Sequence, residues 1–171
     1  MTSETIIAHL AVTPTQQAAL DATLEAFARA STEAMAVGRR AETTSNVVIH
    51  RLCYRALRAR FGLSANLTVR AIAHAARRLK KAGSTEEPGV IEYDRRTFSL
   101  SDNARLLSLS TVHGRVKRIR LHLDDEHRRR LGSERPILAV LRRSEPSRYV
   151  LTISLAPRHP STSIAFLVCF L

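Results

Sequence analysis

The chain of 171 residues is poor in aromatic side chains and in cysteine. Tryptophan is absent and aromatic residues make up 5% of the chain, so a core has to be built from Leu, Ile, Val and Ala. The two cysteines, Cys53 and Cys169, form no CxxC pair and have no histidine pair at zinc spacing nearby. A disulfide framework and a structural zinc site are therefore not expected, and this cysteine content fits a protein of a reducing compartment.

Signals for secretion, membrane insertion and nucleotide hydrolysis are also missing. The N-terminal stretch MTSETIIAHLAVTPTQQ lacks the charged region and apolar run of a signal peptide. The apolar stretch SIAFLVCFL is too short to span a membrane. The chain contains no Gly-rich phosphate loop. We therefore expect a cytoplasmic protein, in the bacterial cytosol or nucleoid, with no membrane partner and no cofactor.

Acidic residues are scarce, and from Thr43 to Thr85 there are none. The chain has 27 Lys and Arg against 15 Asp and Glu, a net charge of +12. Arginine dominates, and its planar fork of donors matches phosphates and base edges. The charge thus predicts a nucleic-acid partner, because basic groups release the counterions of a polyanion. A GC-rich genome would give the same arginine bias without that function.

Hydrophobic spacing predicts one strand and then a helix at the start of the chain. Apolar residues alternate over residues 6–12, as is typical of a strand. Thr13, Pro14 and Gln16 are start signals for a helix, with Thr13 as its N-cap. We expect this helix to end at Gly38.

Two further helices are predicted on either side of Gly62, over residues 47–60 and after the N-cap Ser64. Each combines an apolar stripe with a basic one at helical spacing. Tyr54 lies beside the apolar stripe of the second helix, where packing is favoured over stacking on a base. Two rows of candidate nucleic-acid contacts follow: Arg51, Arg55 and Arg58 on the second helix, and Asn66, Arg70, Arg77 and Lys81 on the third. His74 lies on the same polar stripe of the third helix.

The second half of the chain follows the linker GSTEEPG, residues 83–89, and contains short segments of strand character. Gly114 is predicted to form a hairpin turn. Val116, Ile119 and Leu121 alternate approximately with a third group of candidate contacts: Arg115, Lys117, Arg118 and Arg120. If the first strand pairs with these later strands, the helices form an insertion in a β-barrel.

Four stretches, in this order, resemble the N-terminal half of the transposon-associated RNA-guided nucleases called TnpB (OrfB), which are relatives of the type V CRISPR effectors. The resemblance covers roughly residues 5–155. The stretches are HLAVTPTQQAALDATLEAFARAS, YRALRARFGLSANLTVRAIAHAARRLKK, IEYDRRTFSLSDNARLLSLSTVHGRVKRI and RPILAVLRRSEPSRYVLTISL.

The resemblance implies an α+β fold, in which a small antiparallel wedge-like β-barrel carries an inserted three-helix recognition lobe. It implies guide-type RNA and DNA as partners, held as a heteroduplex by geometry and phosphate contacts. The expected segments are a first barrel strand, a helical lobe, a linker, the rest of the barrel and an atypical tail, over residues 1–12, 13–82, 83–89, 90–155 and 156–171.

The chain departs from that family after residue 155. The family's nuclease domain uses three carboxylates with divalent metal, the first in a Gly-x-Asp-x-Gly strand, and contains a zinc ribbon. Here the sequence continues APRHPSTSIAFLVCFL, with neither feature. We therefore expect a binding protein without catalytic or metal-binding residues, whose tail a frameshift or early stop would explain. An exposed β edge or the tail could pair with another copy.

Two other functions stay open from the sequence. A small DNA-binding regulator would use the Gly62 corner as a helix-turn-helix, with the third helix in the major groove. A metal-dependent nuclease would use Asp124 and Asp125 in the stretch LDDEH. The same acids are better explained as the start of a short helix, which favours negative charge at its N-terminus.

Overall fold

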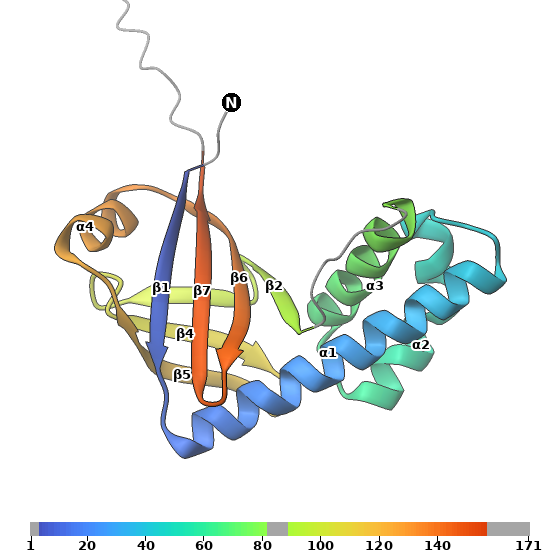
Figure 1. The fold of residues 1–171 in the computed structure, drawn as a ribbon, viewed down its shortest axis with the longest axis horizontal. Coiled ribbons are helices and arrows are strands. Elements are labelled where there is room, and N and C mark those ends of the chain that lie inside the picture. Colours follow the sequence, from blue (N-terminus) through green and yellow to red (C-terminus); the bar gives the residue numbers. More distant parts are fainter. Residues whose placement is uncertain (1–3, 82–88, 157–171) are drawn as a thin grey trace, which may run out of the picture.

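The computed structural model describes residues 4–81 and 89–156. One strand and three helices come first, followed by strands and a fourth helix (Figure 1). In chain order the elements are β1 (Thr5–Ala11), α1 (Pro14–Arg40), α2 (Asn46–Phe61), α3 (Ala65–Lys80), β2 (Val90–Asp94), β3 (Phe98–Ser101), β4 (Leu106–Thr111), β5 (Gly114–His122), α4 (Asp125–Ser133), β6 (Pro136–Glu145) and β7 (Arg148–Leu155).

The strands form one antiparallel sheet in the order β2-β6-β7-β1-β5-β4-β3. The sheet curls into a half-barrel, and α1, α2 and α3 form a lobe beside it (Figure 1). The first strand lies in the middle of the sheet, where His9 is opposite Val150 of β7 and His122 of β5. The helical lobe is thus an insertion between β1 and β2. The expected α+β fold is confirmed.

Local capping signals set the helix boundaries. The Thr13 hydroxyl accepts a hydrogen bond from the Gln16 amide at 3.3 Å, and the Gln16 side chain accepts one from the Thr13 amide at 3.0 Å. Gly62 ends α2 in the left-handed conformation with φ 64°. The Ser64 hydroxyl then accepts a hydrogen bond from the Leu67 amide. These predicted starts and stops are confirmed, because each depends on side chains within one turn of the boundary.

The prediction that Gly38 ends the first helix is wrong. The helix α1 continues to Arg40, and Gly38 is buried inside its last turn. A Cβ atom at this position would lie 3.0 Å from the Thr43 carbonyl oxygen and 2.5 Å from Cδ1 of Leu79. Glycine is needed here because α1 packs closely against the start of α2 and the end of α3.

A β-bulge explains why β5 alternates only approximately. Leu107 is opposite Ile119 and Leu109 is opposite Val116, so β5 has one more residue than β4 over this interval. Arg118 lies within this bulge and adopts a positive φ of 60°. The hairpin turn predicted at Gly114 is confirmed, with φ 97°.

Hydrogen bonds attach the first turns of α1 to the end of the sheet. Gln16 Nε2 donates to the Lys117 carbonyl in the bulge at 3.1 Å, and the Val112 amide donates to Thr23 Oγ1 at 3.2 Å. Asp21 accepts hydrogen bonds from the Tyr149 hydroxyl at 2.7 Å and from Arg143 at 3.0 Å. From this end α1 runs outward into the lobe (Figure 1).

One apolar core extends through both parts of the molecule. Ile6, Ala8 and Leu10 face the interior of the sheet, and Phe27 continues the core into the lobe. His74, which the sequence placed on a polar stripe, is only 5% exposed. Its Nδ1 lies 2.9 Å from the Ser31 hydroxyl oxygen, so α1 and α3 share a buried polar contact.

Within residues 4–81 and 89–156, no helix has the length and apolar character to cross a membrane.

Replacing Gly38 by Ala should lower the free energy of unfolding by about 1–2 kcal/mol, because the new methyl group overpacks the junction of the three helices. Gly132→Ala in α4 is the matched control, since no atom lies within 4 Å of a Cβ there. That change should instead stabilise the protein by about 0.5–1 kcal/mol. Urea unfolding of the three proteins checks this, and equal effects of the two changes would contradict the packing role of Gly38.

Candidate functional site

The outward surface of α2 is rich in arginine. This helix buries only Ile49, Cys53 and Leu57. The opposite side is exposed, and we name it the α2 outer face: Val47, Val48, Arg51, Leu52, Arg55 and Arg58. Within the part of the chain that the structure describes, no carboxylate lies within ion-pair distance of these three arginines. Their positive charge is therefore available to a ligand.

Apolar side chains on the α2 outer face were not among the predicted contacts. Val47 is 60% exposed and Leu52 is 57% exposed. The sequence could have indicated this exposure, because both residues lie on the same side of the helical wheel as the arginines and away from the apolar stripe. A surface that mixes arginine with exposed aliphatic side chains can contact both phosphates and sugar or base surfaces.

Tyr54 lies at the border of the α2 outer face and packs rather than standing free. Its ring stacks on His50 with centroids 4.6 Å apart, and it is partly buried against the core. The preference for packing over base stacking thus agrees with the geometry. Asn66 lies half-buried in the first turn of α3, and Lys81 is exposed at the end of that helix.

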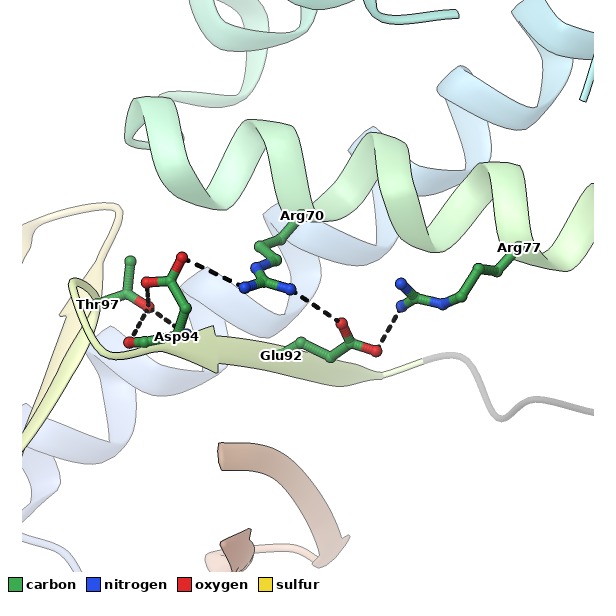
Figure 2. Close-up of polar contacts among 5 residues, drawn as sticks. All are labelled: Arg70, Arg77, Glu92, Asp94 and Thr97. Atoms are coloured by element: carbon green, nitrogen blue, oxygen red, sulfur yellow. Dashed lines mark hydrogen bonds and ion pairs between the residues drawn. The ribbon is translucent and has the colours of Figure 1, made fainter. Parts of the chain in front are cut away.

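The arginines of α3 are placed differently from those of α2. Arg70 lies 3.3 Å from Asp94 and 3.8 Å from Glu92, both on β2, and Arg77 forms an ion pair with Glu92 (Figure 2). The four side chains are partly buried between α3 and β2. Arg70 and Arg77 of the predicted row are therefore neutralised within the chain, and they join the lobe to the edge of the sheet.

The turn after β2 holds Asp94 in position. Thr97 Oγ1 donates to the Asp94 carbonyl and lies 3.1 Å from its carboxylate, and the Arg96 amide donates to the same carboxylate at 3.0 Å. Partial burial acts to raise the pKa of Asp94, but these hydrogen bonds together with Arg70 outweigh it and lower the pKa. Asp94 is thus held ionised as a partner for Arg70 (Figure 2).

The predicted contacts on β5 divide into two groups. Arg115 reaches across the sheet and donates to Ser99 Oγ at 2.8 Å and to the Arg96 carbonyl, so it is engaged within the fold. Lys117, Arg118 and Arg120 are exposed around the bulge. These three form a second, smaller basic surface, distinct from the α2 outer face because it lies on the half-barrel rather than on the lobe.

The acidic cluster at the start of α4 is explained by helix capping. Asp124 is the N-cap, accepting a hydrogen bond from the His127 amide at 2.8 Å and lying 2.6 Å from the His127 ring nitrogen Nδ1. Asp125 pairs with Arg128. Throughout the described ranges, no group of three or more His, Cys, Asp or Glu side chains has the geometry to hold a metal ion. The predicted helical turn is confirmed.

No protein-family model matches the chain, and no curated protein matches it. The charge and geometry of the described residues are therefore what indicates a partner. The helical segment 14–81 contains twelve Lys and Arg against four Asp and Glu, a net charge of +8. With Arg70 and Arg77 paired to β2, the α2 outer face is where arginines at regular spacing remain exposed.

Replacing Asp94 by Asn tests the contact between lobe and sheet. At pH 7 the variant should be less stable by about 1–3 kcal/mol, the usual cost of losing hydrogen bonds to a charged group. Because folding lowers the pKa of Asp94, its contribution is present above the ordinary carboxyl range and is lost as the pH falls below about 4.

The difference between wild type and Asp94→Asn should therefore shrink toward pH 3, as measured by urea unfolding at several pH values. Asp102→Asn, in an exposed turn, serves as the control and should follow wild type throughout. A difference that stays constant from pH 7 to pH 3 would show that the charge of Asp94 does not stabilise the fold.

Proposed function

We propose that this protein binds nucleic acid through the α2 outer face and does not cleave it. The observation that supports this most directly is the row of Arg51, Arg55 and Arg58, exposed and without a carboxylate partner in the described part of the chain. The row spans about 10 Å along the helix at 1.5 Å per residue. One strand of a duplex carries about three phosphates over that length, so three arginines match it.

Guide-type RNA paired with DNA is the partner that we favour. The resemblance of the sequence to TnpB-like proteins implies such a heteroduplex, which a protein grips through its A-form shape and backbone while base pairing provides the sequence specificity. Lys117, Arg118 and Arg120 on the half-barrel would contact a second stretch of backbone. With such a partner, the bacterial cytosol or nucleoid is the proposed location.

The geometry does not favour the helix-turn-helix alternative. A reader helix has to present its side chains to the major groove. Here α3 packs against α1 through His74, and its two central arginines are paired with Glu92 and Asp94 on β2. Binding through α3 would require these contacts to break, whereas the α2 outer face needs no rearrangement.

Changing Arg51, Arg55 and Arg58 together to Gln should weaken binding to a 20-base-pair RNA–DNA heteroduplex by about 100-fold, at about 1 kcal/mol for each exposed contact. The slope of log affinity against log salt should also become shallower by about two to three, because fewer counterions are released. Fluorescence anisotropy at several salt concentrations measures both quantities.

The matched control removes the same charge from arginines that already have carboxylate partners. Arg29, Arg60 and Arg148 pair with Glu25, Glu33 and Glu145, and the triple change of these arginines to Gln should leave the affinity within about threefold of wild type. Equal losses in both triple variants would point to net charge alone. Unchanged binding after the α2 substitutions would refute the proposed interface.

A further inference from the structure

A second candidate site lies on the outer face of the half-barrel, away from the helical lobe. Here β1, β5 and the start of α4 enclose a groove of about 440 Å³. Its walls include the apolar side chain of Ile7, which is 60% exposed. The polar lining consists of His9, His122, Asp124, His127 and Arg128. Histidines from three separate elements thus meet at one surface depression.

Strand register brings the first two histidines together. His9 on β1 is directly opposite His122 on β5. Both are exposed, and the alternate residues Ala8, Leu10 and Leu121 are buried, so the two imidazoles point to the outer face. Side chains opposite one another in an antiparallel pair have Cβ atoms about 5 Å apart. Two imidazolium ions at this spacing repel each other unless an anion lies beside them.

The other charges that line the groove are already paired. Asp124 holds His127 through the 2.6 Å contact to Nδ1 and also caps α4, so the N-terminus of that helix is not open to a ligand. Arg128 pairs with Asp125 at 2.9 Å and donates to the Leu123 carbonyl, while its Nε is buried without a hydrogen-bond partner among the described residues.

His9 and His122 differ from these paired groups. His9 and His122 have no carboxylate within ion-pair distance in residues 4–81 and 89–156. Arg120, the neighbouring outward residue on β5, is exposed and lies opposite Ala11 of β1. Histidine side chains generally change charge between about pH 5 and 8. Because both histidines face the groove, an imidazolium form of either one adds positive charge there that no ion pair of His9 or His122 within the described residues offsets.

We propose that this groove is a pH-dependent phosphate-binding site, in which His9 and His122 hold the anion as imidazolium ions and Arg120 assists. The size of the groove suits a nucleotide, and Ile7 provides an apolar surface for its base. The phosphate can come from a nucleic-acid strand or from a free small anion, and the chemistry of recognition is the same. The site is independent of the α2 outer face, since no residue of the lobe lines it.

Two probes whose charge is constant between pH 6 and 8 test the proposal: inorganic sulfate, and a tetrauridylate without terminal phosphate. Histidine C–H signals in NMR spectra, assigned with single His→Gln variants, report binding at each ring. We expect the signals of His9 and His122 to shift with about tenfold tighter affinity at pH 6 than at pH 8. A bound anion that raises one histidine pKa by one unit changes the affinity by at most about tenfold across the full titration, and two histidines acting together can reach tenfold within this interval.

Either single variant, His9→Gln or His122→Gln, should weaken binding as read at the ring that remains, and His113→Gln should keep the wild-type response, because His113 is exposed in the turn between β4 and β5, outside the groove. Binding of sulfate alone identifies a free anion as the ligand, and tighter tetrauridylate binding identifies a strand. Failure of both probes to shift His9 and His122 in wild type, or an affinity independent of pH, overturns the proposal. The triple α2 variant should respond like wild type, so the two proposals fail separately.

Discussion

The two-sided pairing of β1 is the constraint on which the rest of the structure depends. This strand is among the first elements of the chain, yet its hydrogen-bond partners are β5 and β7, which follow the whole helical segment. The chain has to leave the sheet after Ala11, build three helices, and return at Val90 on the outer edge of the same sheet. Such pairing between distant segments is slow to form because loop closure precedes any gain from contacts. When the helices of the lobe fold against α1, the two ends of the segment between β1 and β2 come closer together, which lowers the entropy cost of closing that loop.

Charge is distributed so that the two basic helices have different roles. The acids of the first half are few, and those that neutralise α3 come from the second half of the chain, on β2. Glu92 and Asp94 thus form ion pairs with Arg70 and Arg77 (Figure 2). The regular row of arginines that remains exposed lies on α2. A buried or half-buried ion pair contributes little net stability but fixes orientation, since an unpaired partner is costly. The same carboxylates therefore define where the lobe sits and which of its faces stays basic.

The sequence predicted the features that depend on neighbouring residues. The capping box at Thr13, the stop at Gly62 and the turn at Gly114 are set within one turn of chain, and the order of strands and helices followed from hydrophobic period. It could not predict features that arise where distant segments meet. Glycine often ends a helix, but Gly38 lies inside α1 and allows close packing of α1 against α2 and α3. His74 has the helical spacing of an exposed residue, but it is buried and contacts Ser31. The tail proposed for self-association lies outside the described residues.

The length of α1 has a consequence for how the protein can vary. Its 27 residues span about 40 Å, with the first turns bonded to the sheet and the last turns packed against α2 and α3. The helix therefore fixes both the distance and the rotational angle between sheet and lobe. One inserted residue between these attachment zones would advance the lobe by 1.5 Å and turn it by 100°, which would carry the guanidinium groups of α3 away from the carboxylates of β2. An insertion or deletion in this part of α1 would therefore keep the relative orientation of sheet and lobe only if its length were close to a whole number of helical turns.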